Sequence, residues 1–192
     1  DGGVLVFNSN DDLVTNIVNS STKSIRKIQY GSVDHELING TTYIKTSEGN
    51  VPLEVFGDHN LSNLCAAKQI CSLLGVFDDE FYAAIANFKG ASNRLETIYR
   101  DNSKIIIKDF AHSPSKLKAS IDAVKKQFSN KNIIAVYELH TFSSFSKDFI
   151  NEYYGTMSNA EIKIIYYDKD VLSKKSEIEI DEKTIKIAFG DY

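Results

Sequence analysis

A predicted strand in the second half of the chain ends in two residues that could bind a ligand or transfer a proton. Asp109 and His112 close the strand Lys104–Phe110, and Ser113 and Pro114 follow as the N-cap and first residue of a predicted helix. In open α/β sheets, ligands bind beyond the carboxyl ends of the strands. A helix N-terminus there offers free N–H groups, which favour a phosphate or a carboxylate. Asp109 could equally cap a turn, and His112 could pack against the helix start.

The next predicted strand, Asn132–Glu138, also ends in polar residues, because His140 and Thr141 lie directly behind it. The carboxyl ends of parallel strands meet at one edge of a sheet, so we expect both polar groups at the same edge. On residue type alone, His140 is as consistent with packing as with catalysis.

A second pair of candidates begins a helix in the first half of the chain. Asn60 and Asn63 are three residues apart and share a helix face. An amide offers both a donor and an acceptor, so Asn60 could read the edge of a base, although both residues could simply cap the helix. Arg94 and Glu96 could form an exposed ion pair of little energetic value.

The elements that would position these residues begin with a mixed region. We expect a strand at Val4–Asn8, a helix from Asp12 to about Ser20, three segments that pair as a small antiparallel sheet (Ile25–Tyr30, Thr41–Lys45 and Val51–Phe56), and helices at Asn60–Leu74 and Asp79–Phe88. Gly75 fits the left-handed position that closes the first of these two helices.

After Gly90 the pattern changes to alternating strands and helices. Beyond Lys104–Phe110 we expect a helix at Pro114–Phe128, a strand at Asn132–Glu138, a helix around Ser146–Met157, a strand at Ile162–Tyr167 and a last strand at Thr184–Phe189. This alternation predicts an α/β fold with a mainly parallel sheet covered on both faces. The predicted domains are residues 1–88 and 89–192.

Composition excludes several classes of function. The net charge is −4 and the lysines are scattered, which argues against a nucleic-acid surface. No apolar run approaches the roughly 20 residues that span a bilayer, so no membrane partner is expected. Cys65 and Cys71 are expected to be unpaired, which fits a cytoplasmic protein.

The start of the sequence indicates either a processed chain or a piece of a longer protein, and we favour the piece. The chain begins with Asp1 and its only methionine is Met157. The dipeptide Gly-Lys does not occur, so these residues carry no G-x-x-x-x-G-K-[ST] phosphate-binding loop. They also show no cysteine–histidine spacing typical of a metal site.

Three segments resemble motifs of the Mur ligase family in order and spacing. Gly57–Ala67 resembles G-x-H-N-x-x-N-x-x-A-A, Phe88–Glu96 resembles F-x-G-x-x-x-R-x-E, and Asp109–Pro114 resembles D-x-A-H-x-P. The resemblance implies the end of a central ATP-binding domain, with a small antiparallel sheet and helices. A Rossmann-like C-terminal domain would follow it, truncated in this chain.

The resemblance also implies roles for particular residues. In this family, ATP phosphorylates a substrate carboxylate, and an amine then displaces the phosphate. His59, Asn60 and Asn63 would lie by the nucleotide, Arg94 by its terminal phosphate, Asp109 by the ribose hydroxyls or Arg94, and His112 by the incoming amine. The Mg²⁺ ligands are expected mainly upstream of these residues, and this part alone is expected to be inactive.

The acceptor is indicated by the segment Glu138–Ser144. It corresponds to a place where L-alanine-adding members of the family resemble P-H-R-Y-x-R, and here Thr141 and Ser144 stand at the arginine positions. A hydroxyl cannot replace the charge with which arginine binds a carboxylate. With His140, these residues are the expected substrate-binding group. The resemblance favours the murein peptide ligase branch, which joins L-Ala-γ-D-Glu-meso-diaminopimelate to UDP-N-acetylmuramate in peptidoglycan recycling.

Two alternatives stay open from sequence. The first keeps the family and takes L-alanine as the acceptor for UDP-N-acetylmuramate. The second is a non-catalytic α/β module that binds a nucleotide or another anion.

Overall fold

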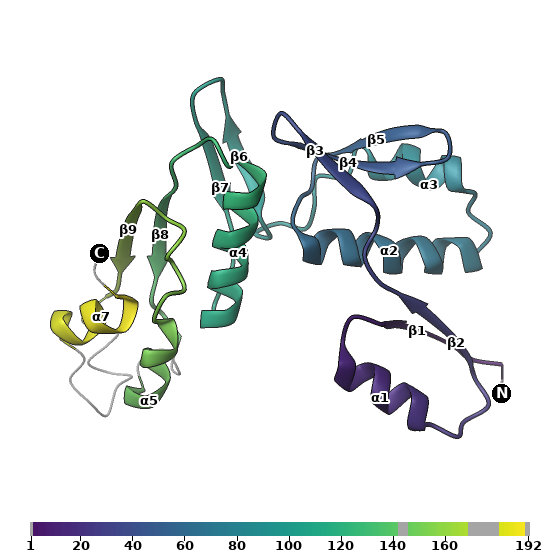
Figure 1. Ribbon diagram of the computed structural model, residues 1–192, viewed down its shortest axis with the longest axis horizontal. Coiled ribbons are helices and arrows are strands. Elements are labelled where there is room, and N and C mark those ends of the chain that lie inside the picture. The colour runs from purple at the N-terminus through teal and green to yellow at the C-terminus, as the bar shows by residue number, and fades with distance from the viewer. Residues whose placement is uncertain (1, 142–145, 169–180, 191–192) are drawn as a thin grey trace. The chain divides into compact units, whose positions relative to one another are not determined.

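The computed structural model describes residues 2–141, 146–168 and 181–190, and it divides into two compact units, Asp1–Ser92 and Asn93–Tyr192. Figure 1 shows the elements of each unit. The fold is α/β, with a small antiparallel sheet, parallel strand pairs and helices, as the sequence predicts. Every helix within the described ranges is too short or too polar to span a lipid bilayer.

The first unit opens with a parallel β-α-β segment. Strands β1 (Val4–Asn8) and β2 (Arg26–Tyr30) pair in parallel and are connected through helix α1 (Asp12–Ser20). Asp11 begins this helix, because its carboxylate accepts a hydrogen bond from the Val14 amide at 3.0 Å. The predicted pairing of Ile25–Tyr30 in the antiparallel sheet is therefore wrong. A helix between two strands allows a parallel crossover, and β2 takes that partner.

The antiparallel sheet instead contains β3 (His35–Ile38), β4 (Thr41–Thr46) and β5 (Gly49–Leu53). Strand β3 was not expected from sequence. Asn39 and Gly40, at φ values of 51° and 75°, make the tight turn between β3 and β4. The Asn-Gly turn was predicted, but one of the two strands that it joins was missed.

Two helices complete the first unit, α2 (Asp58–Leu73) and α3 (Asp78–Ile85). Gly75 adopts a φ of 88° after α2, and the Val76 amide donates to the Cys71 carbonyl, which confirms the predicted left-handed end. The two cysteines are unpaired, as expected, and each is half-buried. The core of this unit contains Ile44, Leu53, Val55, Leu61, Leu64 and Phe81.

The second unit begins with an antiparallel hairpin of β6 (Glu96–Arg100) and β7 (Ile105–Lys108). The predicted strand Lys104–Phe110 is thus shorter than expected, and β6 was not foreseen. The Asp101 carboxylate closes the turn by accepting hydrogen bonds from Ser103 and from the Lys104 amide at 2.7–2.8 Å. These bonds lower the pKa of Asp101 well below its ordinary value, with the Lys104 amide as the largest cause.

Helix α4 (Pro114–Gln127), strand β8 (Ile134–Glu138) and strand β9 (Ile162–Tyr166) follow, and β8 pairs with β9 in parallel. Between these strands, the predicted helix around Ser146–Met157 shrinks to α5 (Lys147–Ile150) and the 3₁₀ turn η2 (Asn151–Tyr153). Gly155 has a φ of 73°, a left-handed conformation that no helix continues through.

The last predicted strand, Thr184–Phe189, is wrong, because helix α7 (Glu182–Phe189) occupies this place. The Asp181 carboxylate caps the helix by accepting from the Thr184 amide at 2.8 Å. Ile185, Ala188 and Phe189 are all buried, which is the i, i+3, i+4 spacing of one helix face.

The core of the second unit covers one face of the β8–β9 pair. It contains Leu117, Ile121, Ile133, Ala135, Tyr137, Leu139, Ile150, Tyr153, Met157, Ala160, Ile185, Ala188 and Phe189. Strand residues alternate between faces, so Ile134 and Val136 turn the other way and are 62% and 68% exposed. The prediction of a sheet covered on both faces therefore fails for this strand pair.

Candidate functional site

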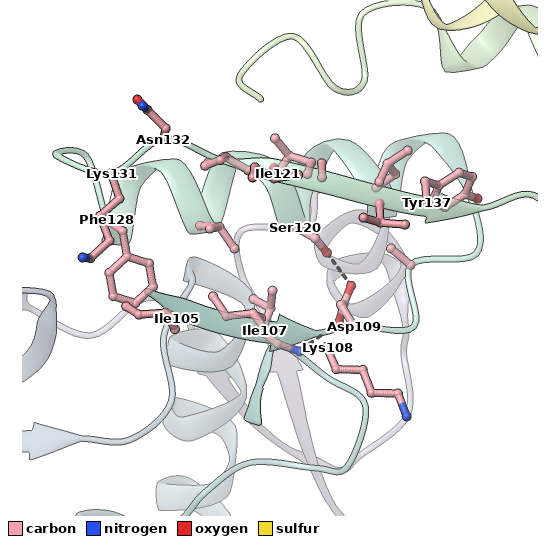
Figure 2. Close-up of a pocket in the computed structure, with 18 of the residues that line it drawn as sticks. Ile105, Ile107, Lys108, Asp109, Ser120, Ile121, Phe128, Lys131, Asn132 and Tyr137 are labelled. Atoms are coloured by element: carbon pink, nitrogen blue, oxygen red, sulfur yellow. Dashed lines mark hydrogen bonds between the residues drawn. The ribbon is translucent and has the colours of Figure 1, made fainter. Parts of the chain in front are cut away.

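Asp109 fastens three parts of the second unit together at the end of β7. One carboxylate oxygen accepts a hydrogen bond from the Leu95 amide at 2.9 Å, and the other accepts from the Ser120 hydroxyl of α4 at 2.6 Å. Figure 2 shows the bond between Asp109 and Ser120 beside the cavity that these residues line. Asp109 therefore holds the segment before β6 against α4.

The segment held by Asp109 carries Arg94. Asn93 and Leu95, its two neighbours, have φ values of 57° and 46°, a conformation that non-glycine residues adopt only when the surroundings hold them. The Asn93 amide donates to Glu96 at 2.8 Å, and the Asn93 carbonyl accepts from the Phe110 amide at 2.9 Å. The Arg94 side chain itself is exposed. Glu96 thus fixes the backbone of this loop, a role that differs from the Arg94–Glu96 ion pair considered from sequence.

Phe110 brings the two predicted polar strand ends together. Its ring centroid lies 5.3 Å from that of His112 and 6.1 Å from that of His140. The ends of β7 and β8 therefore lie close together, as expected, but the two strands belong to separate pairs, β6–β7 and β8–β9, and not to one sheet. The Nδ1 atoms of both histidines lie close to the carbonyl oxygen two residues earlier, at 3.2 Å for Phe110 and 3.1 Å for Glu138. His112 also lies 3.2 Å from the ammonium nitrogen of Lys116, measured from Nε2.

Thr141 follows His140 directly in the chain and is half-buried. Ser144, the remaining predicted substrate-binding residue, lies outside the described residues.

A cavity of about 970 Å³ adjoins this cluster between β7, α4 and β8. Figure 2 shows Asp109 and Tyr137 toward one end of it and Phe128 and Lys131 toward the other. Apolar side chains make up just over half of the wall, and the charged and polar side chains include Lys104, Lys108 and Lys131 as well as Asp109, Glu138 and His140. Burial raises the pKa of the Tyr137 hydroxyl well above its usual value, and a 2.9 Å hydrogen bond with the Tyr153 hydroxyl raises it further.

The other candidates belong to the first unit and lie at the start of α2. His59 and Asn63 are exposed and four residues apart, and Asn60 is half-buried between them. The side-chain nitrogen of Asn60 donates a hydrogen bond to the Phe56 carbonyl at 2.8 Å, which fixes the side chain. The side-chain oxygen of Asn60 takes no part in that bond. Gly57 precedes the helix at a φ of 90°, where a side chain would be strained.

Sequence reasoning missed three residues of the second-unit cluster. Ser120 is a small polar residue on the apolar face of α4, three residues after Leu117 and one before Ile121. This polar interruption of an apolar face could have indicated a hydrogen-bonding role. Lys116 follows His112 at a spacing of four residues. Phe110 had no sequence signal beyond its place in the strand. Among the described residues, no group of three His, Cys, Asp or Glu side chains could hold a metal ion.

Comparison with known proteins gives related sequences and folds. No protein-family profile matches the chain. UDP-N-acetylmuramate–L-alanine ligases are 32% identical over 122 residues in Cytophaga hutchinsonii and 31% identical over 159 residues in Cutibacterium acnes. These alignments cover 64% and 76% of this chain but only 24% and 33% of the two relatives.

The UDP-N-acetylmuramate-alanine ligase structure from Thermotoga maritima superposes with a TM-score of 0.68 at 16% identity, over 98% of this chain and 41% of that one. At that identity the match shows the shared fold. Together, the comparisons support membership of the Mur ligase family. The curated relatives carry the name of the L-alanine ligase, which was the alternative to the peptide ligase favoured from sequence.

Proposed function

We propose that this chain works within an ATP-dependent ligase that forms an amide bond on UDP-N-acetylmuramate. The chain spans about a quarter to a third of the length of its curated relatives. In this proposal residues 1–88 are the C-terminal half of the central domain, and residues 89–192 belong to the C-terminal domain. The observation that carries the proposal is the polar cluster at the ends of β7 and β8, where Asp109 also fastens the Arg94 loop to α4. A cytoplasmic location remains a prediction from sequence.

The start of α2 fits the base of a nucleotide. Asn60 and Asn63 present amide groups on one helix face, and His59 adds an imidazole four residues before Asn63. Amides and imidazoles donate and accept hydrogen bonds, as the edge of adenine requires. The fixed Asn60 side chain reduces the entropy that binding would cost.

Arg94 would supply positive charge to the phosphoryl group in transfer. Its exposed side chain projects from a loop whose backbone amides donate hydrogen bonds to Asp109 and Glu96. A positioned guanidinium stabilises charge on phosphoryl oxygens without reorganising during the reaction. Asp109 would therefore act on Arg94 by holding its loop. ATP brings the phosphoryl group, and Mg²⁺ would be held mainly by residues outside this chain.

His112 would accept a proton from the incoming amine. In the proposed reaction, a carboxylate oxygen of UDP-N-acetylmuramate takes the phosphoryl group and ADP leaves. The amine nitrogen then attacks the carbonyl carbon, loses a proton, and expels phosphate with its bonding electrons. A neutral histidine can accept this proton through the lone pair of a ring nitrogen.

The names of the curated relatives favour L-alanine as the acceptor. Thr141 favours the alternative acceptor, L-Ala-γ-D-Glu-meso-diaminopimelate. It stands where the resemblance places an arginine, and its hydroxyl cannot neutralise the carboxylate of a free amino acid. With His140, it would contact the acceptor in either case.

Phosphate release distinguishes these readings. The full-length gene product is given ATP, Mg²⁺ and UDP-N-acetylmuramate, with L-alanine or the tripeptide as acceptor. Release with one acceptor and not the other identifies the substrate. A folded protein that binds ATP, and releases no phosphate with either acceptor, would support the non-catalytic module instead.

A further inference from the structure

Lys116, in the first turn of α4, lies beside one ring nitrogen of His112, and a backbone carbonyl lies beside the other. Its ammonium nitrogen lies 3.2 Å from Nε2, and the Phe110 carbonyl oxygen lies 3.2 Å from Nδ1. An ammonium group can only donate a hydrogen bond, and a carbonyl oxygen can only accept one. Both contacts form together only if Nε2 accepts and Nδ1 donates. The geometry therefore selects the neutral ring protonated at Nδ1.

We propose that Lys116 is a positioning residue that holds His112 in this Nδ1–H form, with its lone pair on Nε2. The proton of a neutral histidine goes to the nitrogen whose hydrogen bond requires it. Lys116 faces one ring nitrogen and the Phe110 carbonyl faces the other, so the two constraints act in the same sense.

The local fold brings Lys116 to the histidine. His112 and Lys116 are four residues apart, and Pro114 begins α4 between them with a fixed φ. Side chains on a helix point back toward its N-terminus, so a lysine in the first turn reaches the residues that precede the helix. The Phe110 ring, 5.3 Å from the imidazole, packs beside it.

The catalytic consequence rests on the proposed ligase function. A lone pair on Nε2 is the group that would accept the proton lost by the incoming amine. Lys116 is exposed, so its ammonium can leave Nε2 when the amine arrives. The proton then moves from the amine nitrogen to Nε2, while Nδ1 keeps its hydrogen bond to the Phe110 carbonyl.

The test measures the tautomer of His112 directly in the 192-residue chain. Long-range proton–nitrogen NMR spectra at alkaline pH, where imidazoles are neutral, distinguish a protonated ring nitrogen from one with a lone pair. The His112 signals are assigned by their loss in His112→Gln. Lys116→Met removes the donor, and Lys116→Arg keeps a group that can only donate. Lys118→Met is the matched control, because Lys118 lies on the same helix and pairs with Asp122 at 2.7 Å.

We expect the Nδ1–H form to dominate in the natural chain and in Lys116→Arg and Lys118→Met. Lys116→Met should shift the tautomer ratio about fivefold toward Nε2–H, the effect of one net hydrogen bond. An unchanged ratio in folded Lys116→Met, or a natural chain already protonated at Nε2, would overturn the proposal.

Turnover of the full-length gene product separates this inference from the proposed function. Loss of kcat in Lys116→Met, with an unchanged KM for ATP and rescue by Lys116→Arg, supports the catalytic consequence. A folded natural protein without ligase activity would reject the proposed function, and the tautomer result would still decide the role of Lys116.

Discussion

The Asp109 carboxylate accepts a hydrogen bond from the backbone amide of Leu95 at 2.9 Å, one residue beyond Arg94. An acidic residue at the end of β7 thus acts on the candidate catalytic arginine through the main chain. Because the same carboxylate also accepts from Ser120, the position of the Arg94 loop depends on α4.

Removing the Asp109 carboxylate should destabilise the second unit and loosen the Arg94 loop. Asp109→Ala deletes two hydrogen bonds to a charged acceptor, and we expect a loss of about 2–3 kcal/mol in the free energy of unfolding. Ser120→Ala deletes one of them and should cost about 1 kcal/mol. Urea denaturation measures both, and hydrogen exchange at the Leu95 amide reports the loop. Equal stability of Asp109→Ala and the natural chain would show that these bonds are not formed.

Asn63→Ala should weaken nucleotide binding without unfolding the protein. The side chain is exposed, so its loss removes little packing, and the free energy of unfolding should change by less than about 0.5 kcal/mol. If it contacts adenine, the KM of the full-length gene product for ATP rises several-fold. Ser72→Ala, at an exposed position near the end of the same helix, is the control. An unchanged KM would remove Asn63 from the site.

Acid stability should depend on Glu161, at the start of β9. Its pKa is lowered from 4.5 to about 2, first by the hydrogen bond from Lys125 and then by the Ile133 amide. A lowered pKa in the folded state stabilises the protein above 4.5, and this contribution is lost as the pH falls toward 2. Glu161→Gln should therefore be less stable at neutral pH and should lose less on acidification.

Urea midpoints measured from neutral pH down to about 2 test this expectation. Glu152→Gln, at an exposed position of η2, serves as the control. Parallel acid curves for Glu161→Gln and the natural chain would contradict it.

The buried Tyr137–Tyr153 hydroxyl pair should limit stability at alkaline pH. Burial, and then the hydrogen bond with the Tyr153 hydroxyl, raise the pKa of Tyr137 above the ordinary 10. A raised pKa in the folded state stabilises the protein below 10, and that contribution is lost as the pH rises further. Tyr137→Phe should cost about 1 kcal/mol at neutral pH and should flatten the alkaline loss. Thermal unfolding of both proteins from neutral pH to above 10 measures this loss of stability. An equally steep loss in Tyr137→Phe and the natural chain would refute the expectation.

Local signals predicted much of the fold. The Ser113-Pro114 start of α4, Gly75 after α2 and the β-branched runs of β8 and β9 each act within a few residues, so sequence alone identified them. The pairing of β2 was misjudged because partner choice depends on contacts distant in sequence. Helix α7 was misjudged because its β-branched residues outweighed the buried i, i+3, i+4 spacing of Ile185, Ala188 and Phe189.

The candidate site was predictable where topology alone decides position. The ends of β7 and β8 do lie close together, as the Phe110–His140 contact shows, although the two strands belong to separate strand pairs and not to the single sheet edge that was expected. Ser120 and Lys116 were not predictable as partners, because their roles depend on where the Asp109 and His112 side chains point. Sequence spacing gives the direction of a residue from its helix, but not the group that it meets.

The most direct test of ligase function follows the carboxylate oxygen of UDP-N-acetylmuramate. The full-length gene product is given ATP, Mg²⁺, an acceptor amine and substrate labelled with a heavy oxygen isotope in its carboxylate. If the carboxylate is phosphorylated and then attacked by the amine, one labelled oxygen appears in the released phosphate, with equal amounts of amide. Unlabelled phosphate without amide would mean that water takes the phosphoryl group, which contradicts the ligase function.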